Sequence, residues 1–292
     1  MKALIIAEHA AAAAELVAGA RTMADEVVAI SFGGAYECGA DKVLNITVPE
    51  GLTVDSAVET VNAAFDAENP EVVLVEACRH MKVIAGSLAF HADTAVITDV
   101  TAFEAGGAKS MYFGGIAERV QKAAGNVAIY TVGAGVFDGA EGANGSVAEQ
   151  EWVAPLAGEV VSSQVIEKSG VNLFKADVVV AAGRGFAEES QLSLANDLCD
   201  KLGAGLACSR PLTEGVNWLP TERYVGVSGL MLTPKVYIAA GISGQMQHMV
   251  GCNRSGAIFA INKDKNAPIF KQCDFGLIGD IKDVLPAITA AL

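Results

Sequence analysis

The chain has 292 residues, about twice the length of a typical domain, so two domains with separate cores are expected. Hydrophobic residues make up 52% of the chain and charged residues only 18%, which predicts that another subunit covers part of the apolar surface. The formal net charge of −14 repels polyanions, and this excludes nucleic acid and anionic membrane surfaces from the expected partners.

The cysteine pattern and the N-terminal sequence indicate in which cellular compartment the protein is expected. Six cysteines are scattered through the chain without a Cys-x-x-Cys motif or Cys/His spacing, which argues against a disulfide framework and against a zinc or iron–sulfur site. No apolar run reaches the ~18 residues that a membrane span needs, and the N-terminus turns charged after one short strand. We therefore expect reduced thiols, no metal, no membrane insertion and a cytoplasmic location.

The first half of the sequence alternates short runs of valine and isoleucine with alanine-rich stretches of helical length, one of which begins at 10–14. This spacing is typical of a parallel sheet flanked by helices, so we predict an N-terminal parallel-sheet α/β domain over residues 1–165. Its expected strands are residues 3–7, 27–31, 43–46, 72–76, 95–98 and 127–132.

A second set of strand runs follows a glycine-rich segment, 138–146, and a polar passage that reaches residue 170. These features place the domain boundary near residue 165 and predict a second, C-terminal Rossmann-like domain over 166–292. Its expected strands are residues 178–181, 205–208, 236–239 and 257–261.

Two helices are predicted in this second domain. Apolar residues recur at helical spacing over 192–202, and Gly203 follows where a left-handed C-terminal cap is favoured. A similar pattern covers 281–292, where we expect Pro286 to break or restart the helix.

Ligands of an open α/β sheet bind beyond the carboxyl ends of its strands, so the residues that follow each run are candidates for a site. The segment 241–244, Gly-Ile-Ser-Gly, follows a strand and precedes a helix, which suits the binding of a pyrophosphate. Glycine-rich turns between a strand and a helix are also common without any ligand. His248 falls in the first turn of that helix. It could reach a ligand there, or be a satisfied, half-buried histidine.

Two arginines and one aspartate also lie at strand ends or at the start of a helix. Arg210 precedes Pro211, which favours an extended backbone that points the guanidinium away from the sheet, where it either stabilises negative charge on a cofactor ring or forms a surface ion pair. Arg184, between two glycines, suits a ligand contact or an ordinary exposed turn. Asp280 could bond a ribose hydroxyl or simply cap the last helix.

No catalytic set is recognisable. The sequence has no nucleophile elbow, P-loop or His-Glu-x-x-His motif. Glu8 and His9 stand together at a strand end, and we interpret this pair as structural.

Taken together, the strand-end segments resemble the α subunit of electron transfer flavoproteins. The likeness runs almost continuously through the second domain, over residues 178–185, 207–212, 224–229, 234–248, 260–270 and 276–280. The first domain is similar more loosely, at residues 5–9, Ile-Ile-Ala-Glu-His, and at 111–115, which the resemblance puts on a strand.

The resemblance implies an FAD that is reduced by an acyl-CoA dehydrogenase or another donor, and a heterodimer in which a β subunit covers the flavin. Arg210, Ser228 and His248 would contact the flavin ring, while Ser209, Ser243, Gly244 and Gln247 would serve the ribityl chain and phosphates. Arg184, Asn262 and Asp280 would bind the adenosine half. The cofactor-binding residues that the resemblance implies are Arg184, Ser209, Arg210, Val225, Gly226, Val227, Ser228, Gly241, Ser243, Gly244, Gln245, Met246, Gln247, His248, Asn262, Asp280 and Ile281.

The sequence departs from the family pattern at Val227 and Ser228, where family members commonly carry Gln-Thr, so one polar flavin contact is missing. Two other functions remain open at this point. One is a self-sufficient flavin- or nicotinamide-dependent oxidoreductase, which would need an acid or base near the ring. The other is a nucleotide-sensing module without a redox role.

Overall fold

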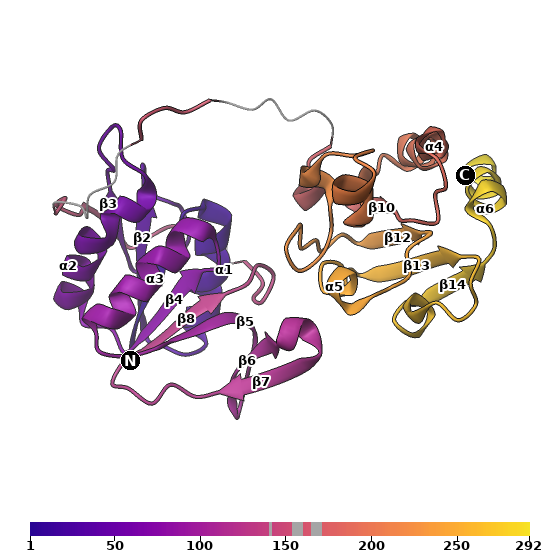
Figure 1. The fold of residues 1–292 in the computed structure, drawn as a ribbon. Helices are drawn as coiled ribbons and strands as arrows, with labels where there is room; N and C mark the ends of the chain where they lie inside the picture. Colours follow the sequence, from indigo (N-terminus) through magenta and orange to yellow (C-terminus); the bar gives the residue numbers. More distant parts are fainter. Residues whose placement is uncertain (140–141, 154–159, 165–170) are drawn as a thin grey trace. The chain divides into compact units, whose positions relative to one another are not determined.

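The computed structural model describes residues 1–139, 142–153, 160–164 and 171–292, which form two compact units (Figure 1). Each unit is an α/β structure with its own sheet and its own core, and each is considered separately. The expected boundary near residue 165 and the polar passage through 168–170 lie outside the described residues.

The N-terminal unit is built on one sheet with the strand order β7-β6-β5-β8-β4-β1-β2-β3-β9. The strands from β5 through β8, β4, β1, β2 and β3 to β9 are all parallel, which confirms the predicted sheet type. The strand bounds are β1 Lys2–Ile6, β2 Glu26–Phe32, β3 Lys42–Ile46, β4 Val72–Glu76, β5 Val96–Glu104, β6 Gly107–Tyr112, β7 Ala117–Gln121, β8 Ala128–Val132 and β9 Ser146–Glu149.

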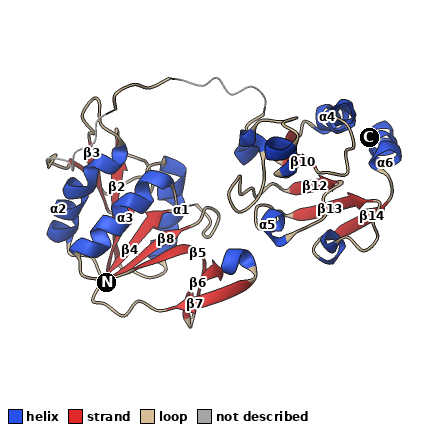
Figure 2. Ribbon diagram, viewed as in Figure 1, coloured by secondary structure: helices blue, strands red, loops and turns tan. Residues whose placement is uncertain are grey.

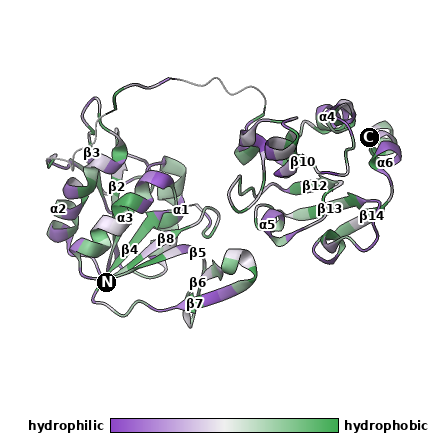
Figure 3. Ribbon diagram, viewed as in Figure 1, coloured by the Kyte–Doolittle hydropathy of each residue, from purple (hydrophilic) through white to green (hydrophobic). Residues whose placement is uncertain are grey.

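Helices cover both faces of this sheet, and the strands are therefore nearly continuous apolar runs. Helix α1, Ala10–Arg21, packs on one face, and α2, Val58–Glu68, packs with α3, Arg79–His91, on the other. Figure 3 shows the central strands β4 and β8 in the hydrophobic colour and β7, at the sheet's far edge, as largely hydrophilic.

The sheet contains three strands that the sequence pattern missed. Of residues 111–115, which the family resemblance put on a strand, Met111 and Tyr112 end β6, and residues 113–115 form a 3-10 turn. Strands β6 and β7 extend β5 as an antiparallel meander, so the sheet is not wholly parallel. Strand β9 pairs in parallel with β3. The Asn144 side chain just before β9 accepts hydrogen bonds from the backbone N–H groups of Cys38 (3.2 Å) and Gly39 (3.1 Å). The segment 138–146 lies between the two expected sets of strands and inside the predicted domain 1–165, and its described residues, 138–139 and 142–146, belong to the N-terminal unit.

The C-terminal unit has a five-stranded parallel sheet with the order β11-β10-β12-β13-β14. Numbered within the unit, this is the doubly wound order 2-1-3-4-5, whose switch point lies between β10 and β12. The bounds are β10 Val178–Ala182, β11 Gly205–Cys208, β12 Val236–Ala240, β13 Ala257–Asn262 and β14 Phe275–Ile278.

Helices α4, Leu192–Leu202, and α6, Ile281–Ala291, pack on one face of this sheet (Figure 2). The other face is covered by irregular chain that buries Val225, Leu232 and Met249, the last from the single-turn helix α5, Met246–Met249. Short turns of 3-10 or π helix lie at Val54–Ala57, Phe113–Gly115, Leu173–Lys175, Glu189–Gln191, Pro211–Gly215, Thr221–Arg223 and Pro268–Lys271.

The two predicted helices differ in outcome. Gly203 adopts the left-handed conformation (φ 62°) and caps α4 as predicted. The predicted break at Pro286 is wrong, because α6 runs through it without interruption. Pro286 and Lys282, whose carbonyl would have accepted the missing hydrogen bond, are both exposed, so water can satisfy that carbonyl.

Candidate cofactor site

A cavity of about 1100 Å³ opens at the carboxyl ends of β10 and β12, at the switch point of the C-terminal sheet. Sites for small ligands usually measure about 300–1000 Å³, so this one suits a large ligand such as a dinucleotide. Of the predicted residues, those that line the cavity are Arg184, Ser209, Arg210, Val225, Val227, Ser228, Gly241, Ser243, Gln245, Gln247, His248 and Asn262.

The floor of the cavity is built from closely packed glycine backbone. The Gly185 N–H donates to the Gly241 carbonyl at 2.9 Å. Gly241 has a φ of +65°, and a Cβ there would stand 2.7 Å from the Cα of Gly185. Side chains are therefore excluded where the two strand ends meet, and a ligand can approach the backbone directly.

The expected pyrophosphate site at a helix end is only partly realised. The glycine segment 241–244 does leave a strand, but α5 begins at Met246 and has just four residues. A single turn supplies little of the dipole that the argument assumed. The glycine backbone, rather than a helix terminus, shapes this part of the cavity.

His248 is a buried polar residue of the site. Its side chain lines the cavity, its Nε2 lies 2.9 Å from the Tyr237 hydroxyl, and its Nδ1 is buried without a hydrogen-bond partner in the described part of the chain. Burial lowers the pKa of His248 to about 4, and the nearby Val225 backbone only tempers that shift. The imidazole is therefore neutral at physiological pH, and it is a buried histidine that also faces the site.

The backbone prediction for Arg210 is wrong, although the residue does line the cavity. Arg210 is helical (φ −45°, ψ −41°) because Pro211 opens a one-turn π helix. The Arg210 carbonyl accepts from the N–H groups of Thr213 and Glu214, both at 3.0 Å, and these bonds outweigh the local preference before proline. The Arg210 Nε donates to Glu214 Oε2 at 2.6 Å, and the arginine side chain is 59% exposed.

Ser228 is held by a tyrosine that the sequence reasoning did not include. The Tyr224 hydroxyl lies 2.8 Å from Ser228 Oγ and accepts from the Ser228 N–H at 3.3 Å. The next loop position, Val227, donates its N–H to the Gln247 carbonyl at 2.8 Å and leaves its side chain half exposed. These bonds fix the loop that carries Ser228 against α5.

Asn262 ends β13 and holds the far side of the cavity. Its Nδ2 donates to the Ile242 carbonyl at 2.8 Å, and its Oδ1 accepts from the Asp264 N–H at 3.0 Å. Both polar atoms of the amide thus have protein partners. Asn262 orders the two loops beside it as well as lining the site.

Five predicted residues do not line the cavity. Gly226 and Met246 lie beside lining residues, and Gly244 packs against Ile269 with a φ of +82°. Asp280 caps α6 by accepting from the Lys282 N–H at 3.0 Å, and Ile281 is buried in the core.

The sequence reasoning also missed several lining residues. Among them are Tyr224, Glu214 and Asp264. Glu214 stands one helical turn after Arg210, a spacing that was the available signal for the pair. Asp264 follows a strand end directly, where the same rule that selected Asn262 would have found it.

The fold and the cavity together define a two-domain α/β protein with a ligand site at the switch point of its second sheet. Residues 3–157 match the electron transfer flavoprotein domain, and residues 172–253 match the electron transfer flavoprotein FAD-binding domain. The chain is 39% identical to Protein FixB of Escherichia coli O157:H7 and to that of Shigella flexneri, each over 95% of this chain and 94% of the relative. It is 38% identical to Protein FixB of E. coli O127:H6 (strain E2348/69 / EPEC), with the same coverage.

The chain belongs to the electron transfer flavoprotein α-subunit family and is an electron transfer flavoprotein subunit. One solved structure, a putative thiamin diphosphate-dependent enzyme from Mycobacterium smegmatis, is 12% identical with a TM-score of 0.26, covering 86% of this chain and 55% of that one; a likeness this slight carries no argument. Within the described ranges, no helix is long and apolar enough to cross a bilayer.

Proposed function

We propose that this chain is the α subunit of a heterodimeric electron transfer flavoprotein that holds FAD in the cavity of its C-terminal unit. It would carry electrons between an acyl-CoA dehydrogenase-type protein and a second redox partner. One observation carries the proposal: most of the residues that line the cavity fall within 172–253, the part that matches the FAD-binding domain.

The residues present fit such a cofactor. The volume accommodates a dinucleotide, the glycine floor allows close approach, and the lining combines apolar walls with arginine, serine and amide groups. The orphan Nδ1 of His248 is a buried polar atom that a ligand can satisfy. Bound FAD would supply one-electron and two-electron transfer, and the protein would bind it, orient it and set the charge around it.

Three groups of residues would contact different parts of the FAD. Arg210, Ser228 and His248 would face the flavin ring. Ser209, Ser243 and Gln247 would serve the ribityl chain and the phosphates, and Arg184 and Asn262 the adenosine half. Gly244 and Asp280 would act indirectly, because one shapes the turn beside the cavity and the other caps α6.

The exposed edge of the C-terminal sheet supports a partner subunit. Strand β14 is an edge strand with Phe275 60% and Ile278 62% exposed. Phe275 stacks on Phe259 of β13 at 4.7 Å, and the two belong to an apolar groove of about 520 Å³. An apolar sheet edge left in water favours association, so we propose that a β subunit covers it.

The cysteines support a reducing compartment. All six are free thiols, and four of them are buried. We propose a cytoplasmic location on this ground together with the absence of a membrane-spanning helix from the described ranges.

Co-expression with an electron transfer flavoprotein β subunit tests the proposal. The expected product is a yellow heterodimer with one FAD per α chain, identified by mass after denaturation. Asn262→Ala should weaken FAD retention, while Asn253→Ala, outside the cavity, serves as the matched control. A colourless product, an FMN in place of FAD, or reduction of the isolated α chain by NADH without a partner would refute it.

A further inference from the structure

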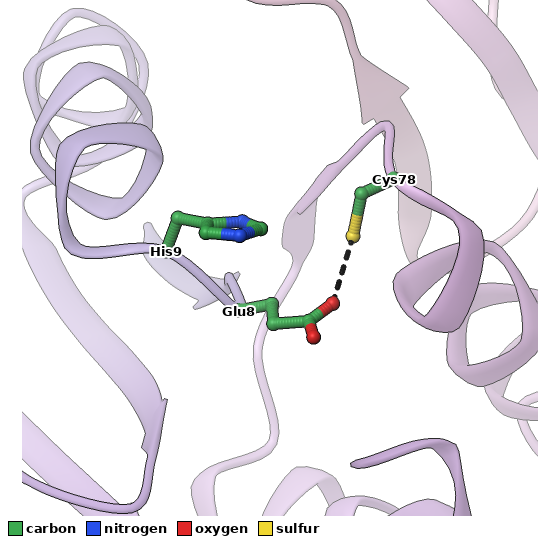
Figure 4. A group of neighbouring side chains, drawn as sticks. All are labelled: Glu8, His9 and Cys78. Atoms are coloured by element: carbon green, nitrogen blue, oxygen red, sulfur yellow. Dashed lines mark hydrogen bonds between the residues drawn. The ribbon is translucent and has the colours of Figure 1, made fainter. Parts of the chain in front are cut away.

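A second group of chemistry-bearing side chains lies in the N-terminal unit, far along the sequence from the cofactor cavity. Glu8 and His9 follow β1, while Cys78 follows β4 and precedes α3. One potential ligand atom from each of these three residues lies within 4.8 Å of the others (Figure 4). The cysteine spacing predicted no metal site, because these ligand types come together only when the sheet forms.

The location is the switch point of the N-terminal sheet. Strand β1 pairs with β2 on one side and with β4 on the other. The strand order therefore reverses at β1, because β2 and β3 extend the sheet on one side and β4 begins the other side. Loops diverge at such a point and leave room for a ligand at the carboxyl ends of the strands. Glu8, His9 and Cys78 occupy that position.

His9 is already oriented as metal-binding histidines are. Its Nδ1 lies 2.7 Å from Oε1 of Glu76, and a neutral ring that donates through Nδ1 would leave the lone pair of Nε2 for a metal ion. A carboxylate that fixes the outer nitrogen of a histidine ligand is the usual outer-sphere arrangement at zinc. The other Glu76 oxygen accepts from the backbone N–H groups of Glu8 (2.8 Å) and His9 (3.1 Å), which locks the carboxylate in place.

Glu8 is held in a similar way. Its two carboxylate oxygens lie 3.0 and 3.1 Å from Nδ1 of His80, and its Oε2 lies 3.3 Å from the Cys78 sulfur. Sulfur and oxygen ligands of one tetrahedral zinc ion stand about 3.5 Å apart. The Glu8–Cys78 pair therefore already has the separation that a shared cation requires.

The ligand types and their access to solvent also favour a cation. A bound divalent ion deprotonates a coordinating thiol, so Cys78 would bind it as a thiolate. The His9 side chain is mostly exposed, which leaves a path for the ion from solvent.

We propose that Glu8, His9 and Cys78 bind one divalent transition-metal ion of the zinc class, with Glu76 and His80 as outer-sphere partners. A set of one oxygen, one nitrogen and one sulfur ligand suits zinc, and three protein ligands leave a fourth position open. Binding releases the thiol proton to solvent and changes no oxidation state.

The test uses the full-length protein with its partner subunit, treated with a chelator and then titrated with Zn²⁺ and with Co²⁺ as a spectroscopic probe. We expect one equivalent of zinc by native mass spectrometry. Cobalt should give a sulfur-to-metal charge-transfer band in the difference absorption spectrum. Cys78→Ser should abolish that band and weaken zinc binding at least about tenfold, while Cys273→Ser, a partly exposed thiol elsewhere, should change neither.

Two further substitutions separate ligation from general charge. Glu76→Gln should weaken zinc about 10- to 100-fold while the sulfur band persists at saturation, because it removes only the outer-sphere partner of His9. His9→Gln should weaken zinc at least as much, with His91→Gln as the control, and circular dichroism checks folding. Failure to bind either metal, a sulfur band that survives Cys78→Ser, or equal losses in the controls would overturn the site.

Discussion

Replacing His248 with glutamine removes a buried titrating ring while keeping a group that can bond the Tyr237 hydroxyl. The folded-state pKa of His248 is about 4, below the 6.5 of an unperturbed histidine, because burial disfavours the charged form. Between these values the unfolded chain binds a proton that the folded chain excludes. The parent protein therefore loses stability as the pH falls from 6.5 towards 4, and above pH 6.5 the group has no effect.

The size of this loss follows from the pKa difference. A difference of roughly two to three pKa units at about 1.4 kcal/mol each gives destabilisation on the order of 3 kcal/mol below pH 4, and about 2 kcal/mol at pH 5 relative to pH 8. His248→Gln should abolish this part of the pH dependence. At neutral pH it should cost only about 1 kcal/mol, the scale of one altered hydrogen bond.

Urea unfolding followed by tryptophan fluorescence measures the effect. The chain has two tryptophans, so a Trp152→Phe background leaves Trp218 to report on the C-terminal unit. His91→Gln, at the surface of the N-terminal unit, is the matched control and should keep the parent's pH dependence for this unit. If His248→Gln and its parent lose stability in parallel between pH 8 and pH 5, to within about 0.5 kcal/mol, the burial argument is refuted.

Three other outcomes are expected. Gly244→Ala should lower the free energy of unfolding by about 1–3 kcal/mol, because the φ of Gly244 is +82° and a Cβ would meet Ile269. Thermal unfolding measures this loss, and an unchanged melting temperature would contradict the prediction. Asp280→Ala should cost about 0.5–2 kcal/mol by removing the cap of α6, and Asp280→Ser should recover most of it, as denaturant titration can show. Arg210→Ala should lower the reduction potential of the bound flavin and Glu214→Gln should raise it, because the two residues form one ion pair at the cavity. If spectroelectrochemistry shows that both substitutions shift the potential in the same direction, this interpretation is wrong.

The sequence predicted the sheets well because buried parallel strands are apolar runs. All ten expected strands are present, and β4 and β11 have the predicted bounds. Four of the described strands were missed, β6, β7, β9 and β14, and two of them lack that signal for an identifiable reason. Strands β7 and β9 are partly or fully exposed, so polar residues interrupt their runs, and pairing rather than composition defines them.

The candidate cofactor site was predictable to the extent that it follows strand ends. Arg184 was a candidate on that ground, Ser209 and Asn262 were implied by the family resemblance, and all three follow a strand and line the cavity. The Tyr237–His248 contact depends on where irregular chain folds back onto the sheet, which no periodicity encodes. The same holds for Cys78, since its neighbours Glu8 and His9 are about seventy residues away in the sequence.

Strand β9 has a consequence for any attempt to express the N-terminal unit alone. Because β9 returns from beyond residue 145 to cover the backbone of β3, a fragment that ends after β8 would leave that strand with unpaired N–H and C=O groups along an apolar sequence. The fragment would also lose Trp152, which packs against the core. Such a truncation should aggregate, whereas one that extends past residue 153 should remain monodisperse. The minimal foldable piece is thus set by its last strand and not by the last helix-strand repeat.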